Sequence, residues 1–217
     1  MRPRLDEAQA DQRAVYFVDT AHFVYGAFLG ILWCVQRLFV KTPPGRQRLN
    51  VLAALNAVTK EIVSVANTSY VTAHTVCSLL CELAAKHPGH AITVILDNAR
   101  YQRCFLVQQM AAQLGIELLF LPAYSPNLNL IERFWKFVKK KVLYGKYYPT
   151  SAAFQEAILS CIAEAATQHQ GELASLLTLN FQTFEALPIV GQPAQGGEVA
   201  PDERPTDEMQ KVLSMAA

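Results

Sequence analysis

The segment AITVILDN, residues 91–98, decides the fold class because it is apolar almost throughout and ends in an acid, Asp97. A half-buried strand would alternate apolar and polar side chains, whereas a continuous apolar run suits a central strand covered on both faces. Sheets covered on both faces by helices are typical of α/β proteins. The segment therefore predicts a strand in the middle of a sheet, with Asp97 near its carboxyl end.

Strand and helix signals alternate on both sides of this segment. AVYFVDTAHF (14–23) and IELLFLP (116–122) predict two further buried strands, and a hairpin is predicted over 49–67. Apolar residues at helical spacing predict helices over the ranges 72–86, 103–114, 127–143 and 151–168. We therefore expect an α/β fold, a mixed sheet with helices on both faces, whose two strand–helix–strand units are parallel crossovers.

Length and composition indicate one globular domain. The chain has 217 residues, of which 52% are hydrophobic and 17% charged, enough for a substantial core. Residues 1–13 are polar and expected to be frayed, residues 14–185 should form the domain, and residues 186–217, rich in Pro, Gly and acids, should be a disordered tail.

The cysteines and the apolar runs indicate a cytoplasmic protein. The five cysteines are scattered without metal-binding spacing, which is typical of reduced thiols. The longest apolar run, 23–35, has thirteen residues, fewer than the roughly 20 that a membrane-spanning helix needs. No signal peptide precedes it, so we expect no membrane partner.

Three acids stand where a catalytic site is expected. Asp19 and Asp97 lie at or near the carboxyl ends of buried strands, where open α/β sheets place their sites. Glu132 lies one turn into the helix predicted over 127–143. Each acid alone has an ordinary explanation, such as a turn or an ion pair between Glu132 and Lys136. Together they would supply oxygen ligands for two divalent cations about 4 Å apart, an arrangement that cleaves phosphodiesters.

Three segments in order resemble the catalytic blocks of the DDE transposases. They are VDTAHF (18–23), LDNARYQR (96–103) and LPAYSPNLNLIERFWKFVKKKV (121–142), and they are most similar to the bacterial insertion-sequence group related to the mariner elements. Thirty-four residues separate Asp97 from Glu132, the spacing typical of that group. One departure is a glutamine at position 102, where the family often has histidine.

The resemblance implies a chemistry and a set of site residues. The expected fold is ribonuclease H-like, with two Mg²⁺ or Mn²⁺ ions bound by Asp19, Asp97 and Glu132. The reaction would be hydrolysis that frees a DNA 3′-OH, followed by transfer of that strand to target DNA. Similar elements insert at TA dinucleotides. A protein of this kind would work in the bacterial cytoplasm, associated with the nucleoid when bound to DNA.

The resemblance also implies partners. These are DNA, as element ends and target, and a second copy of the chain that pairs two ends. Relatives carry an N-terminal helix-turn-helix region that reads the ends, but here about thirteen residues precede the first strand. We therefore expect a partner chain that carries this region, as in a split reading frame, or a truncated remnant.

A basic segment adjoins Glu132 and predicts DNA contacts. Residues 132–148 carry six basic side chains against one acid, although such a run is usually a solvated face. Its position beside the expected metal site favours contacts to phosphates. The candidate DNA-binding residues are Arg133, Lys136, Lys139, Lys140, Tyr124 and Asn98.

Two of these assignments have alternatives in the sequence, and His22 near Asp19 has a structural interpretation. Tyr124 could stack on a base or simply pack against the protein, and Asn98 could contact a phosphate or orient its loop. His22 should face away from Asp19 along the same strand, as a structural histidine.

Two other interpretations of the whole chain stay open. A ribonuclease H or another nuclease with the same fold would need a further acid, for which Glu82 is the candidate. An inactive or accessory transposase remnant would bind DNA or a partner without cutting. The presence of all three acids argues against such a remnant, and the missing DNA-reading region argues for it.

Overall fold

The structure is a computed structural model that describes residues 1–26, 35–36, 39, 47–122 and 125–181. The chain divides into two units, Met1–Gln182 and Thr183–Ala217. The predicted tail over 186–217 lies outside the described residues, so the domain boundary at 185 stays a prediction.

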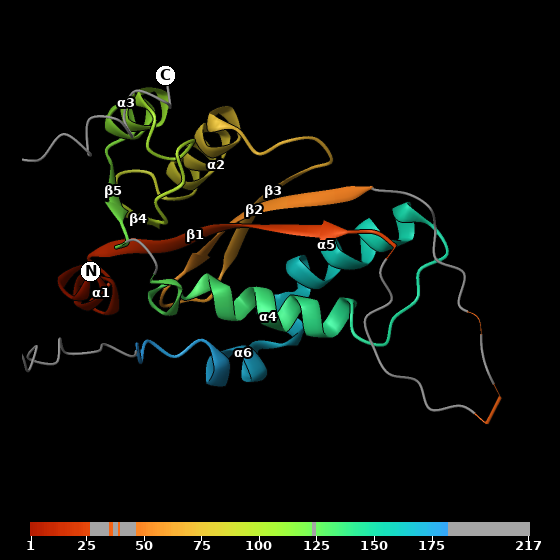
Figure 1. Ribbon diagram of the computed structural model, residues 1–217. Helices are drawn as coiled ribbons and strands as arrows, with labels where there is room; N and C mark the ends of the chain where they lie inside the picture. The colour runs from red at the N-terminus through yellow and green to blue at the C-terminus, as the bar shows by residue number, and fades with distance from the viewer. Residues whose placement is uncertain (27–34, 37–38, 40–46, 123–124, 182–217) are drawn as a thin grey trace, which may run out of the picture. The chain divides into compact units, whose positions relative to one another are not determined.

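A five-stranded mixed sheet forms the centre of the first unit, with the strand order β3-β2-β1-β4-β5 (Figure 1). The strands are β1 (Arg13–Val24), β2 (Arg48–Asn56), β3 (Ile62–Asn67), β4 (Ala91–Leu96) and β5 (Ile116–Phe120). The pairs β1–β2 and β2–β3 are antiparallel, whereas β1–β4 and β4–β5 are parallel. The predicted hairpin and both parallel crossovers are confirmed. The segment AITVILDN contains β4, which lies inside the sheet next to the central strand, β1.

Helices cover both faces of this sheet, as expected (Figure 1). On one face, α2 (Ala73–Lys86) and α3 (Phe105–Gln113) pack on the side chains of Tyr16 and Val18. On the other face, α4 (Ile131–Val142) and α5 (Ser151–Gln168) pack on Val15 and Phe17. Because side chains alternate along a strand, odd-numbered residues of β1 face α4 and even-numbered ones face α2.

The N-terminal segment is more ordered than the sequence predicts. Residues 1–13 were expected to be frayed, but α1 spans Arg2–Gln9 and β1 begins at Arg13. Leu5 and Ala8 are buried in the same core as α4. The expectation of a frayed end was wrong because two small apolar contacts and a set of ion pairs hold a largely polar helix.

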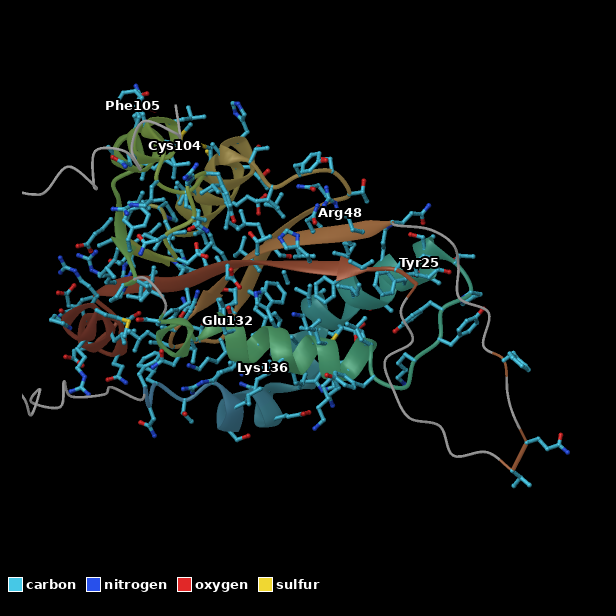
Figure 2. The ribbon with its side chains drawn as sticks, in the orientation of Figure 1. Tyr25, Arg48, Cys104, Phe105, Glu132 and Lys136 are labelled. Atoms are coloured by element: carbon cyan, nitrogen blue, oxygen red, sulfur yellow. The ribbon has the colours of Figure 1, made fainter. Side chains whose placement is uncertain are left out.

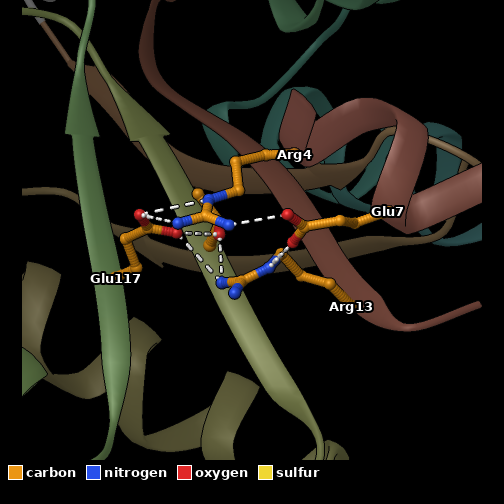
Figure 3. Close-up of polar contacts among 5 residues, drawn as sticks. Arg4, Glu7, Arg13 and Glu117 are labelled. Atoms are coloured by element: carbon orange, nitrogen blue, oxygen red, sulfur yellow. Dashed lines mark hydrogen bonds and ion pairs between the residues drawn. The ribbon is translucent and has the colours of Figure 1, made fainter. Parts of the chain in front are cut away.

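Charged side chains connect α1 to the edge of the sheet (Figure 3). The Arg4 guanidinium lies 2.7 Å from Glu7 and 2.9 Å from Glu117 on β5. Arg13 contacts the same two acids at 2.7 and 2.9 Å, and also donates to Thr93 Oγ1 on β4. The arrangement joins residues far apart in the sequence, which is why no local pattern predicted it.

The helix that carries Glu132 begins later than expected. A helix was predicted from about residue 127, but Pro126–Leu128 form a 3₁₀ turn and α4 begins at Ile131. Asparagine favours turns over helix interiors, so Asn127 and Asn129 delay the helix. A short helix α6 (Gln170–Leu176) was not predicted. No helix among the described residues has the length and apolarity to cross a membrane.

Candidate active site

Asp19 lies on β1, on the face of the sheet that α4 covers. It pairs with Ala53 on β2, and its neighbours on the same face, Phe17 and Ala21, belong to the core beneath α4. His22 faces the other way and its Nδ1 lies 2.7 Å from Asn50 Oδ1. The structural interpretation of His22 is thereby supported.

Asp97 directly follows β4, and the register of the sheet brings it next to Asp19. The parallel pairing of β1 with β4 ends at Phe17 and Ile95, and two further residues along each strand are Asp19 and Asp97. Glu132 is the second residue of α4, which packs against β1 (Figure 2). Asp19 was expected near the carboxyl end of its strand, but β1 runs on to Val24 and stays paired with β2, so that expectation was wrong. Asp19 lies just beyond the last residue of β1 that pairs with β4, and the fold therefore brings the three acids to one face of the sheet where β4 ends.

The carboxyl of Asp19 has a strongly raised pKa. Burial, and to a smaller extent the Glu132 and Asp97 carboxylates, raise the pKa from 3.8 to about 7, while a hydrogen bond from the Thr20 backbone opposes them. Like charges affect each other this way only at short range. Asp19 is therefore an electrostatic neighbour of both other acids, and near pH 7 it holds a proton about half of the time.

No basic side chain compensates these acids within the described ranges. The ion pairs there do not include Asp19, Asp97 or Glu132, and the pair between Glu132 and Lys136 that the sequence allowed is not formed. Two aspartates and a glutamate are the oxygen donors that hard divalent cations prefer. In the part of the chain that the structure describes, however, no three His, Cys, Asp or Glu side chains are gathered as a closed ligand cluster.

Trp135 on α4 lies beside Asp19. Its ring packs edge-on against Phe23 of β1, with ring centroids 6.1 Å apart. The buried indole N–H lowers the pKa of Asp19, yet it lacks a hydrogen-bond partner of normal geometry among the described residues. The sequence identified Trp135 only as part of the apolar stripe and did not indicate this polar role.

The loop after β4 is held by its own polar groups. The Asn98 amide donates to the Leu121 carbonyl, and the Ala99 N–H donates to Asp97 Oδ1 over 3.3 Å. Asn98 thus orients the loop, one of the two roles considered for it, and its contact to DNA stays a prediction. Gln102 is fully buried, and neither polar atom of its amide has a hydrogen-bond partner of normal geometry in the described part of the chain.

The basic residues of α4 divide into two groups. Lys136, Lys139 and Lys140 are exposed. Arg133 instead donates to the carbonyls of Thr178 at 2.8 Å and Asn180 at 2.9 Å. The lysines are therefore free to meet a large ligand, whereas Arg133 connects α4 to the segment after α6.

Two further sequence candidates are Tyr124 and Glu82. Tyr124 lies outside the described residues. Glu82 is exposed on α2, which covers the sheet face opposite to Asp19. The acid that a ribonuclease H would need is thus not supplied by Glu82.

A pocket of about 580 Å³ adjoins Glu132. Its lining is polar and consists of Asn127, Asn129, Glu132, Arg133, Lys136, Thr178 and Asn180. Sequence reasoning missed Asn129, Thr178 and Asn180, because asparagine and threonine carry no charge pattern and the last two lie far from Glu132 along the chain.

A family model described as DDE superfamily endonuclease matches residues 35–155. The chain belongs to this family. The matched range includes Asp97 and Glu132 and begins after Asp19. A comparison with curated proteins found no match.

Solved structures of a transposase share the fold, and an integrase structure is among the similar ones. A Mos1 transposase paired-end complex with left transposon end is 12% identical, covering 82% of this chain and 60% of that chain with a TM-score of 0.51. A Mos1 mariner paired end complex with Mn is 13% identical, covering 85% and 61%, also with a TM-score of 0.51. The HTLV-2 integrase catalytic core domain with magnesium is 12% identical, covering 69% and 82%, with a TM-score of 0.47.

These likenesses show a ribonuclease H-like fold, as the sequence predicted. The chain spans about 60% of the length of the Mos1 chains that it matches. The bacterial insertion-sequence group stays a prediction.

Proposed function

We propose that this chain is the catalytic part of a transposase, which cleaves a DNA strand and joins the freed 3′ end to target DNA. In this proposal Asp19, Asp97 and Glu132 are the metal ligands. One observation carries it: burial, and to a smaller extent the Glu132 and Asp97 carboxylates, raise the pKa of Asp19, and no basic side chain among the described residues offsets the three acids. Such uncompensated acids are costly unless a cation binds them.

Two divalent ions, Mg²⁺ or Mn²⁺, would stabilise the attacking and leaving oxygens of the phosphodiester when bound. The residues of the chain prepare the site. Asp19 must lose its proton before it can serve as an oxygen ligand. The fraction of Asp19 that can bind a metal therefore increases as the pH rises through about 7. The Asn98 amide holds the loop that carries Asp97, and α4 presents Glu132 to the same end of the sheet.

The substrate proposed for this site is DNA in the form of element ends and a target. Lys136, Lys139 and Lys140 are exposed on the helix that carries Glu132, where they would neutralise phosphates without reading sequence. We include in the proposal a second copy of the chain, or a partner with a helix-turn-helix region, that pairs and reads the ends. We further propose that the DNA element is a bacterial insertion sequence and that the protein acts in the cytoplasm.

The test is cleavage of a duplex that carries the element's own end, with Mg²⁺ or Mn²⁺ and with any helix-turn-helix partner supplied. Asp97→Asn keeps the shape of the side chain but removes the charge, so cleavage should be lost while folding and DNA binding persist. Glu82→Gln is the matched control, because it neutralises an exposed acid on the opposite side of the sheet. Equal cleavage by Asp97→Asn and the parent would refute the metal assignment.

Other outcomes of the same experiment separate the remaining interpretations. Cleavage of an RNA–DNA hybrid in preference to the duplex would favour a ribonuclease H. A parent chain that binds the duplex but never cleaves it, even with its partner, would be an inactive remnant.

A further inference from the structure

The pocket beside Glu132 contains a buried polar atom that nothing in the described structure satisfies. Asn129 is only 4% exposed, lines the pocket, and has an amide oxygen without a hydrogen-bond partner among the described residues. Its amide nitrogen lies 3.5 Å from the Val18 carbonyl, next to Asp19. Rotating the amide by half a turn would set oxygen against oxygen, so the acceptor is the unpaired atom.

Two cationic side chains, Arg133 and Lys136, line the pocket beside the acid Glu132, and Arg133 is held in place by contacts. Arg133 is held by the carbonyls of Thr178 and Asn180 and lies 5.9 Å from the ring of Phe181. Lys136 is exposed one turn further along α4 and, like Arg133, forms no ion pair in the ranges that the structure covers. The opening is thus suited to an anionic ligand, while the Asn129 oxygen requires a hydrogen-bond donor.

These two requirements together restrict the ligand. A phosphodiester offers only acceptors, so a phosphate alone would leave the Asn129 oxygen unpaired. Every DNA base carries at least one N–H on its Watson–Crick edge, and side-chain amides recognise such edges. A nucleotide therefore supplies both the negative charge and the donor.

We propose that this pocket binds one unpaired nucleotide of the DNA strand next to the phosphodiester that is cleaved, with a base N–H donating to Asn129 Oδ1. The proposal rests on the proposed function, because Glu132 lines the same pocket. The volume of about 580 Å³ lies within the range of roughly 300–1,000 Å³ in which small-ligand sites fall. A base still paired in a duplex could not present its edge to so deeply buried an atom.

The test compares two probes of equal charge. One is a fluorescein-labelled oligothymidylate of about twelve nucleotides, and the other is an abasic strand with the same number of phosphates. Binding is measured by fluorescence anisotropy with the full chain, in EDTA and again in Ca²⁺. We expect the parent to prefer the oligothymidylate about tenfold, the value of one or two buried hydrogen bonds.

Asn129→Leu should reduce this preference about five- to tenfold and leave binding of the abasic strand unchanged. Its melting temperature should stay equal or rise, because leucine removes an unpaired buried oxygen. Asn180→Ala is the second variant: it shortens an exposed side chain and keeps the carbonyl that binds Arg133. Gln113→Leu is the control, an exposed amide on α3 at the other face.

Three results would overturn the proposal. The first is an unchanged preference in both variants. The second is an equal loss for the abasic strand, which would make this a phosphate site. The third is a loss seen only in Ca²⁺, or only with strands that end in a 3′-hydroxyl, which would assign Asn129 to metal-bound water or to the strand end.

The proposed function is tested by a different measurement, DNA cleavage, so the two proposals can fail separately. A parent chain whose base preference depends on Asn129 but that never cleaves DNA would keep the pocket and reject the transposase. A parent that cleaves, with a preference that Asn129→Leu does not alter, would keep the transposase and reject the pocket.

Discussion

The two faces of the central sheet differ in whether their polar side chains have hydrogen-bond partners. On the face covered by α2 and α3, Tyr16 Oη lies 2.7 Å from His87 Nε2, and His22 contacts Asn50. On the face covered by α4, the Asn129 oxygen and the Trp135 N–H are buried without partners among the described residues, and Asp19 has a raised pKa. Buried polar groups are usually hydrogen-bonded, so each one without a partner needs an explanation, such as a bound water, ion or ligand.

The difference indicates which face is structural and which is functional. Leaving a buried donor or acceptor unpaired costs on the order of 1–3 kcal/mol, so a protein keeps such atoms where something binds. Gln102, whose amide also lacks a partner of normal geometry among the described residues, lies on the loop after Asp97, beside residues of the core under α2 and α3. Substitutions on each face test this division: those on the α4 face should affect DNA cleavage or binding, and those on the α2 face should not.

The largest effect is expected at Glu132. Glu132→Gln should lower the rate of DNA cleavage by more than about a hundredfold, because even residues that only support metal ligands cost about 10–100-fold. The melting temperature should change little. Cleavage assays with Mg²⁺, beside Glu82→Gln on the other face, measure the contrast. A strong loss in Glu82→Gln would contradict the division between the faces.

The next effect concerns the exposed lysines of α4. Replacing Lys136, Lys139 and Lys140 with alanine should weaken DNA binding and lower the slope of log affinity against log salt, by about 0.7–0.9 for each phosphate that is no longer neutralised. Stability should stay within about 0.5 kcal/mol. Anisotropy titrations at several salt concentrations test this, with Lys86→Ala as the control on α2. An unchanged slope would make the lysines a solvated face.

A smaller effect should appear in the pH dependence of stability. Because the folded-state pKa of Asp19 is about 7 against 3.8, the folded protein binds more protons than the unfolded chain between these values. The metal-free protein should therefore lose stability as the pH rises from about 4 through 7, by a few kcal/mol at most.

Asp19→Asn should remove this decline and make the metal-free protein more stable than the parent near pH 8. Urea unfolding in EDTA at a series of pH values measures both chains. The acids that face Asp19, Asp97 after β4 and Glu132 on α4, stay in place in the variant. Parallel curves for the parent and the variant would show that Asp19 is not the group responsible.

The smallest effect is expected on the structural face. Tyr16→Phe removes the hydrogen bond to His87 and should cost about 1 kcal/mol of unfolding free energy. Cleavage should be unaffected, because Tyr16 points toward α2 and away from Glu132. Urea unfolding combined with the cleavage assay gives both quantities. A defect in cleavage without a loss of stability would mean that the α2 face also serves the reaction.

Local sequence patterns predicted most of the sheet because each strand is a self-contained signal. AITVILDN became β4 and the hairpin became β2 and β3 within a few residues. Contacts between residues far apart in the sequence were not predicted. The ion pairs of Arg4 join α1 to Glu117 on β5, and Thr178 and Asn180 reach the site only by folding back onto Arg133.

The site was predicted unevenly for the same reason. The three acids belong to short segments with distinctive neighbours, so their positions could be compared with a known pattern. Asn129 and Trp135 both fell within the helix predicted over 127–143, and the pattern indicated no polar role for either, because burial without a partner depends on what surrounds an atom in three dimensions. The late start of α4 was missed for a different reason, because the apolar spacing that predicted the helix outweighed the turn preference of Asn127 and Asn129.

The attachment of Arg133 to Thr178 and Asn180 gives α4 a mechanical link to the end of the described chain. Arg133 directly follows Glu132, and its two carbonyl partners lie just before Phe181. A pull or a twist applied to the backbone at Phe181 would therefore act on the turn of α4 that carries Glu132. The position of Glu132 is in this sense coupled to the segment after α6, which lies more than forty residues further along the chain.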